Sequence, residues 1–283
     1  YFVYLFGFTL MTLCYSLYRS QMKILGANAL QFLSLTLFSL IFVFLSDSIE
    51  NLFFLTGISM IIFGLIFFYY GLPSFKKFRI NKEKILKFLN FGFVRTPGIF
   101  FQFLLLAGIP LISISYLNLT DQAFLNAGIS LVRIFLVVVG PLGVILLPRI
   151  SKDFKLNKNN FKHTENISIL LNITFYYSLI STYVLILINN QLLNLWLGSF
   201  TNQTNLNIAI ILSSAPFFIL SAVLRSPIDA LSNYGYNSII YGISSATMIL
   251  CFFILTSFKI EPFLIGSLSF WLGNFLSGML SFY

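Results

Sequence analysis

Charged residues are scarce in this sequence. Asp, Glu, Lys and Arg make up 9% of the 283 residues, whereas a soluble domain carries about 25%. Hydrophobic residues make up 58%, and the mean hydropathy is +0.92. So few charges cannot cover the water-exposed surface of a chain of this length. The composition therefore excludes a soluble globular protein and indicates an integral membrane protein.

Cysteine and histidine are also rare. The two cysteines, Cys14 and Cys251, lie in apolar runs, where a free cysteine usually packs as a small hydrophobic residue. His163 stands alone in a basic segment. Because the sequence offers no cluster of Cys and His side chains, we expect no bound metal and no cofactor. It does not specify a coupling ion either.

Long apolar runs make up most of the chain. Runs of about 20 residues match a helix that crosses roughly 30 Å of hydrocarbon. They are continuously apolar, whereas the strands of a membrane β-barrel alternate polar and apolar residues. The sequence therefore predicts an all-α, polytopic membrane protein. Nine transmembrane helices are expected, at about residues 1–18, 29–45, 52–70, 91–117, 122–148, 166–188, 205–224, 237–258 and 262–283.

The connections between these runs alternate in charge. Most of the 17 Lys and Arg residues fall in every second connection, at residues 19–23, 76–87, 149–162 and at Arg225. The positive-inside rule places these basic connections in the cytoplasm of a multi-pass protein of the cell membrane. The net charge of +9 is then explained by topology, and no nucleic-acid partner is expected.

The longest basic connection divides the chain. Residues 73–90 combine lysines with apolar residues at helical spacing, which is typical of a segment that lies at the membrane surface and binds anionic lipid. The sequence therefore predicts the last helices of one bundle at 1–72, an amphipathic cytoplasmic linker at 73–90, and a six-helix bundle at 91–283.

A weak internal repeat favours two related bundles. In both "FTLMTLCYSLYRSQMKILGANALQFL" (8–33) and "FFILSAVLRSPIDALSNYGYNSIIYG" (217–242), an apolar run ends in Arg-Ser, and a polar turn with Asn follows. Repeated bundles are typical of transporters that gate one half against the other.

The expected spans contain two charges, and both are positive. Arg133 lies near mid-membrane, and it shares a helix face with Asn126 and Ser130. Arg95 lies about one turn inside a span and shares a face with Gln102. Because a guanidinium stays charged and forms paired hydrogen bonds with phosphate, these five residues predict a substrate site for an anion such as a diphosphate. The simpler alternatives are a membrane-surface anchor for Arg95, and an anchor or a bond to backbone carbonyls for Arg133.

Proline and glycine residues mark expected bends in two spans. They loosen or break helical hydrogen bonding and are tolerated in membrane helices where neighbours satisfy the backbone. The candidate gating or kink residues are Pro97, Gly98, Pro110, Gly140 and Pro141.

Four ordered motifs carry a family resemblance. "FGFVRTPG" (91–98), "GPLGVILLPRIS" (140–151), "LWLG" (195–198) and "APFFILSAVLRSPIDA" (215–230) resemble the second half of bacterial polysaccharide transporters. These are the O-antigen and capsule oligosaccharide flippases of the MOP superfamily. The resemblance rests on the order and spacing of the motifs and covers nearly the whole chain.

This resemblance implies a fold and a function. The fold is two bundles that form a V with pseudo-two-fold symmetry around a central cavity, with the nine spans as the fourth to twelfth and about three helices missing. The function is transport and not catalysis: such proteins move an undecaprenyl-diphosphate-linked oligosaccharide across the membrane by alternating access. Arg133 and Arg95 match the cavity cations that bind this substrate. Other membrane proteins of polysaccharide assembly are possible partners.

Several other functions fit part of these sequence features. A lipid II flippase and a multidrug and toxin extrusion antiporter have the same fold, but an antiporter for cationic drugs favours intramembrane acids, which the spans lack. A membrane polymerase or ligase usually has a large outer loop with Arg or His, whereas residues 189–204 carry no charge. A scaffolding protein would leave Arg133 unexplained.

Overall fold

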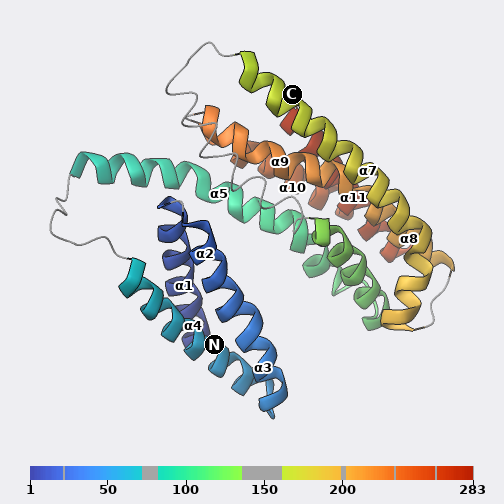
Figure 1. Ribbon diagram of the computed structural model, residues 1–283. Coiled ribbons are helices and arrows are strands. Elements are labelled where there is room, and N and C mark those ends of the chain that lie inside the picture. The colour runs from blue at the N-terminus through green and yellow to red at the C-terminus, as the bar shows by residue number, and fades with distance from the viewer. Residues whose placement is uncertain are drawn as a thin grey trace. The chain divides into compact units, whose positions relative to one another are not determined.

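The computed structural model describes residues 1–21, 23–71, 82–135, 161–198, 202–232, 234–258 and 260–282. Within these ranges all regular secondary structure is helical (Figure 1). The elements are α1 (Phe2–Ser20), α2 (Ile24–Gln31), the π-helix η1 (Phe32–Leu37), α3 (Phe38–Leu45), α4 (Ile49–Gly71), α5 (Lys82–Ser113), a helical segment at 119–135, α7 (Phe161–Leu197), α8 (Asn202–Ser213), α9 (Ala215–Leu231), α10 (Tyr236–Thr256) and α11 (Pro262–Phe282).

Seven helical segments in the described part of the chain are long and apolar enough to cross a membrane. This confirms the all-α class and the multi-pass membrane protein. The seven do not include α1, which occupies the first expected span, nor the helix at 119–135, whose expected continuation lies outside the described residues. The seven are Ile24–Leu45, Ile49–Gly71, Ile85–Ser113, Leu171–Trp196, Gln203–Asp229, Tyr236–Thr256 and Pro262–Phe282.

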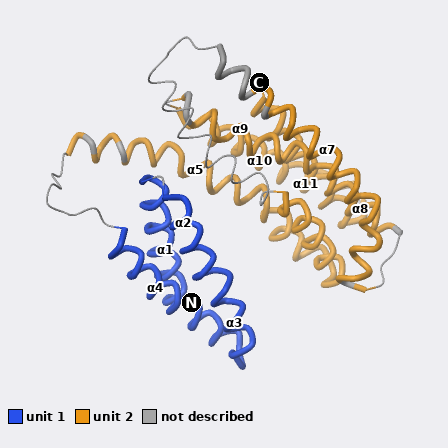
Figure 2. Tube along the Cα trace, in the orientation of Figure 1, with its two compact units in different colours: residues 1–81 blue, residues 82–283 orange. Residues whose placement is uncertain are grey.

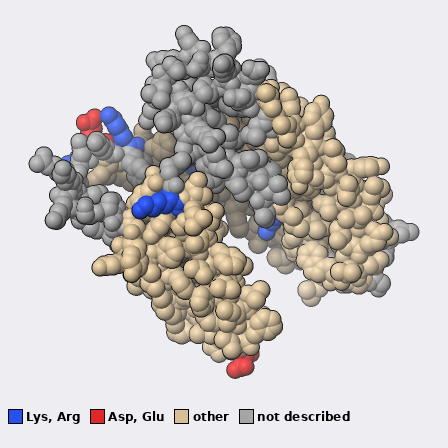
Figure 3. Space-filling model, in the orientation of Figure 1, with Lys and Arg blue, Asp and Glu red and all other residues tan. Residues whose placement is uncertain are grey.

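Charged side chains are few on the described surface. In the space-filling view nearly all of the described surface on the visible face is uncharged (Figure 3). Large side chains such as Phe44 and Leu25 are more than four-fifths exposed. Exposed apolar side chains are favourable in hydrocarbon and unfavourable in water. The described surface is therefore that of a membrane protein, as the apolar composition predicts.

The chain forms two compact units, Tyr1–Asn81 and Lys82–Tyr283 (Figure 2). The division falls inside the segment 73–90 that the sequence predicts as a linker. Residues 82–90 of that segment form the first turns of α5. At 32 residues, α5 is about 48 Å long, which exceeds the hydrocarbon thickness of about 30 Å.

In unit 1, α1 and α4 pack closely along a row of glycines. Gly57, Gly64 and Gly71 repeat every seven residues, so they lie on one face of α4. A Cβ atom on Gly57 would lie 2.7 Å from the backbone N and Cα of Tyr4 in α1. Small residues that allow such close approach are the usual way in which membrane helices associate.

Polar side chains of α1 donate hydrogen bonds to backbone carbonyls of α4 beside the glycine row. The Cys14 Sγ donates to the carbonyl of Gly64 at 3.1 Å, and the Tyr18 hydroxyl donates to the carbonyl of Phe67 at 3.1 Å. These contacts follow the same face as the glycine row. Glycine spacing and side-chain donors together fix the register of the two helices.

In unit 2, α11 is the central helix. It packs against α5, α8, α9 and α10. Its buried side is rich in small and polar residues, and a Cβ atom on Gly273 would lie 2.8 Å from the Cβ of Met248 in α10. This packing gives α5 a fixed support for the side chains described below.

Replacing Gly57 with alanine should destabilise unit 1. The added methyl group collides with backbone atoms of α1, which cannot rotate away, so we expect a loss of about 1–3 kcal/mol. Thermal unfolding of the purified protein in detergent measures this.

Gly92→Ala is the matched control, because a Cβ atom there meets nothing within 4 Å. Alanine is also the better helix former, so the unfolding temperature should stay the same or rise. An equal loss in both variants would contradict the packing role of Gly57.

Candidate functional site

Two prolines interrupt the hydrogen bonding of α5. Pro97 and Pro110 lie inside the helix, and α5 changes direction along its length (Figure 1). A proline has no N–H, so the carbonyl four residues before it loses its helical partner. Inside a membrane such a carbonyl needs a partner from the protein.

Arg133 supplies that partner at Pro110. The carbonyl freed by Pro110 is that of Leu106, and the Arg133 Nη2 donates to it at 2.8 Å. Leu106 lies seven residues before Ser113, the end of α5, which places this bond about 10 Å inside the span. The bond to a backbone carbonyl, one of the simpler alternatives for Arg133, is therefore present.

A second contact holds the other side of Pro110. The Gln122 Nε2 donates to the carbonyl of Pro110 at 2.7 Å, and the Ser113 hydroxyl donates to the Gln122 Oε1 at 2.8 Å. Ser113 is fully buried and Gln122 is half-buried. The helix at 119–135 therefore holds α5 on both sides of the proline.

The structure places Asn126, Ser130 and Arg133 along one open side of the helix at 119–135. Asn126 and Arg133 are exposed and Ser130 is half-buried. Leu131 and Phe135, on the opposite side, are buried in the core of unit 2. The three predicted residues therefore share an accessible polar face.

This open face differs from the open face of α7. At a spacing of seven residues α7 exposes Ile173, Ile180 and Leu187, each about 60% exposed or more. Such large apolar side chains are what a lipid-facing helix presents. At the same spacing the helix at 119–135 exposes Leu119 at its start and then Asn126 and Arg133. Hydrocarbon would not solvate the two polar side chains.

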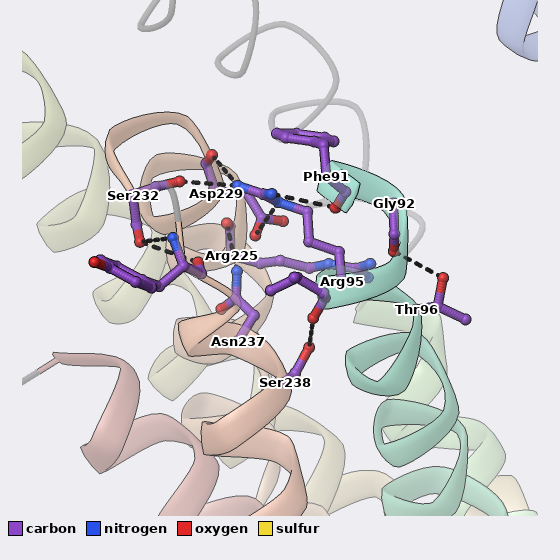
Figure 4. Close-up of polar contacts among 11 residues, drawn as sticks. Phe91, Gly92, Arg95, Thr96, Arg225, Asp229, Ser232, Asn237 and Ser238 are labelled. Carbon is purple, nitrogen blue, oxygen red and sulfur yellow. Dashed lines mark hydrogen bonds and ion pairs between the residues drawn. The ribbon is translucent and has the colours of Figure 1, made fainter. Parts of the chain in front are cut away.

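Arg95 binds the end of α9. Its Nη2 donates to the carbonyls of Asp229 at 3.1 Å and Ser232 at 2.8 Å (Figure 4). Its Nε lies 3.4 Å from the Asp229 Oδ1, and the two side chains are 13% and 20% exposed. The last carbonyls of a helix lack helical partners and carry partial negative charge, so a guanidinium suits this position.

The remaining surface of Arg95 also contacts the protein. Its guanidinium carbon lies 3.6 Å from the centre of the Phe91 ring, a favourable position for a cation. With these contacts Arg95 joins α5 to α9. Binding of a ligand by Arg95 stays a prediction.

Gln102 is contacted by an arginine that the sequence did not single out. The Arg225 Nη1 donates to the Gln102 Oε1, and the Asn237 Nδ2 donates to the carbonyl of Arg225 at 3.0 Å (Figure 4). The sequence predicts a span that ends at residue 224, with Arg225 in the connection that follows. Instead α9 continues to Leu231, because neighbouring side chains support its last turns.

The start of α10 packs closely on α5 near Pro97. The Ser238 hydroxyl donates to the carbonyl of Val94 at 2.9 Å. A Cβ atom on Gly98 would lie 2.9 Å from the Ser238 Oγ, and one on Gly235 would lie 2.5 Å from the Val94 carbonyl oxygen. Glycine at both positions permits this approach.

The predicted site residues therefore form two groups. One group surrounds Pro110 and contains Asn126, Ser130 and Arg133. The other surrounds Pro97 and contains Arg95, Gly98 and Gln102. Arg95 precedes Leu106, the partner of Arg133, by eleven residues of α5, or about 16 Å. The expected kink residues Gly140 and Pro141 lie outside the described residues.

The sequence spacing of Arg225 and Asp229 could have indicated that these two residues act together. Arg225 and Asp229 are four residues apart on α9 and therefore lie on one helix face.

Among the described residues no group of three His, Cys, Asp or Glu could hold a metal ion. The comparisons with protein-family models, curated proteins and solved structures find no match.

Replacing Arg95 with alanine should separate the end of α9 from α5. The change removes charge-assisted bonds to Asp229 and Ser232, so we expect the free energy of unfolding to fall by about 1.5–3 kcal/mol. Thermal unfolding in detergent measures the change.

Lys87→Ala is the control. Lys87 forms an exposed pair with Glu83 at 2.9 Å, and a pair of this kind contributes about 0.3–0.5 kcal/mol. If the two variants unfold at the same temperature, the contacts of Arg95 do not hold α9.

Proposed function

We propose that the protein is a flippase that moves a polyprenyl-diphosphate-linked oligosaccharide across the cell membrane. The observation that supports this most directly is the open polar face with Arg133 on the helix at 119–135. Transport follows alternating access of two bundles, as the resemblance to polysaccharide transporters implies. The protein acts as a carrier for cell-surface polysaccharide synthesis and not as an enzyme.

The membrane environment explains why an exposed arginine points to a ligand. An arginine at the centre of a membrane helix costs about 2.5–3.5 kcal/mol or more when it faces lipid. In the proposed arrangement Arg133 lies inside the membrane, on a side of its helix that the rest of unit 2 leaves open. The favourable arrangement is a face that lines a water-filled cavity, where the substrate passes.

The chemistry of the face suits a diphosphate. A guanidinium has five N–H donors, and among the described residues the carbonyl of Leu106 is the hydrogen-bond partner of Arg133. The terminal nitrogens of the guanidinium can form paired bonds with phosphate oxygens. Asn126 and Ser130 add neutral polar groups that suit the sugar hydroxyls.

The proposal includes an orientation. The basic connections face the cytoplasm, where the substrate is loaded, and the substrate leaves in the outer leaflet. The resemblance to the MOP superfamily implies a V arrangement with the cavity between two bundles. Anionic lipids and other membrane proteins of polysaccharide assembly are the proposed partners.

An antiporter for cationic compounds is supported less well. Such a transporter needs an accessible carboxylate within the membrane. Asp229 lies at the end of a membrane-spanning segment, but Arg95 already binds it. A lipid II flippase would use the same phosphate chemistry and differs only in the glycan.

Replacing Arg133 with alanine in the full-length protein should slow transport. In liposomes with a fluorescent polyprenyl-diphosphate-linked oligosaccharide, the rate at which substrate changes leaflet should fall about tenfold or more, because one charge-assisted bond contributes about 1.5–3 kcal/mol. A membrane-impermeant quencher measures which leaflet holds the substrate.

Ile134→Ala is the matched control, because Ile134 is the exposed apolar neighbour of Arg133. Its rate should match that of the unchanged protein. An unchanged rate in Arg133→Ala would refute the proposed site. Expulsion of a cationic dye, without movement of the oligosaccharide, would favour the antiporter instead.

A further inference from the structure

The two contacts on either side of Pro110 differ in accessibility. The contact of Gln122 with the Pro110 carbonyl is shielded, since Ser113 is fully buried and Gln122 half-buried. The contact of Arg133 with the Leu106 carbonyl is exposed, because Arg133 lies on the open face. A contact with a purely structural role would be stronger if it were buried. The exposed contact of Arg133 with the Leu106 carbonyl can instead be reached by a solute.

The Arg133 contact is also the one that an anion can replace. A guanidinium binds a phosphate through two parallel charge-assisted bonds, which are stronger than a single bond to a neutral carbonyl. A diphosphate that binds both terminal nitrogens of the guanidinium engages Nη2, the atom that donates to the Leu106 carbonyl, and therefore competes with that carbonyl. When the diphosphate binds Arg133, the Leu106 carbonyl loses its hydrogen-bond donor.

The loss of this partner changes α5 at one place. Because Pro110 has no N–H, the Leu106 carbonyl cannot return to the helix and must turn outward to water or another donor. The Gln122 contact keeps the far side of Pro110 in place. The helix then bends between Leu106 and Pro110.

We infer that Arg133 is a switch that exchanges its guanidinium between the Leu106 carbonyl and a lipid-linked diphosphate, so that substrate binding bends α5 at Pro110. This inference rests on the proposed function, since it uses the same phosphate site. The coupling is reciprocal: the bent helix releases Arg133 and binds the diphosphate more tightly.

Pro110→Ala should remove the switch but keep the site. Alanine restores an N–H for the Leu106 carbonyl, so the helix no longer depends on Arg133. The freed guanidinium should bind diphosphate at least as well as before. Pro97→Ala is the matched control in the same helix, because Arg133 contacts the carbonyl freed by Pro110 and not the one freed by Pro97.

Hydrogen–deuterium exchange of the full-length protein in lipid nanodiscs tests the inference. The probe is polyprenyl diphosphate, and polyprenol without the diphosphate is the control ligand. With the probe bound, exchange of the amides of residues 107–113 should rise about fivefold or more in the unchanged protein and in Pro97→Ala. It should not change in Pro110→Ala, although native mass spectrometry still detects the bound probe.

The outcomes separate this inference from the proposed function. If the probe binds through Arg133 but exchange at 107–113 does not rise, the switch is wrong and the phosphate site stands. A rise of equal size in Pro110→Ala also overturns the switch. If the probe does not bind the unchanged protein, or binds Arg133→Ala equally well, both the site and the switch are wrong.

Discussion

The need to satisfy every backbone polar group without water governs this protein. In hydrocarbon an unpartnered carbonyl is costly, so each interruption of a helix requires a donor from elsewhere in the chain. Arg133 supplies one at Pro110, and Arg95 supplies others at the end of α9. These two arginines of unit 2 thus each bind backbone carbonyls that lack a helical partner.

The same requirement separates the two arginines. Arg95 is surrounded by an aromatic ring, a carboxylate and three carbonyls, and these contacts leave it largely buried. Arg133 makes its contact at an open face. One residue type therefore serves as a fixed link between helices at one proline and remains accessible at the other.

Much of the fold could be predicted from the sequence. Hydrophobic length predicted seven of the nine expected spans, since crossing a bilayer fixes the number of apolar residues. Helical periodicity placed Asn126, Ser130 and Arg133 on one face, and the structure keeps them there. These properties depend on a single helix and need no knowledge of its neighbours.

The partners of these residues could not be predicted in the same way. That Arg133 contacts Leu106, or Arg225 contacts Gln102, depends on how two helices are shifted along each other. Hydrophobic patterns do not encode that shift. The sequence likewise predicted the end of a span before Arg225, whereas side chains of neighbouring helices support α9 as far as Leu231.

The glycine row of unit 1 has a mechanical consequence. Gly57, Gly64 and Gly71 are separated by two helical turns, so sliding α1 along α4 by a single turn would press its backbone against bulky side chains. The two helices cannot shear past each other in small steps. The two helices therefore move together as one rigid pair.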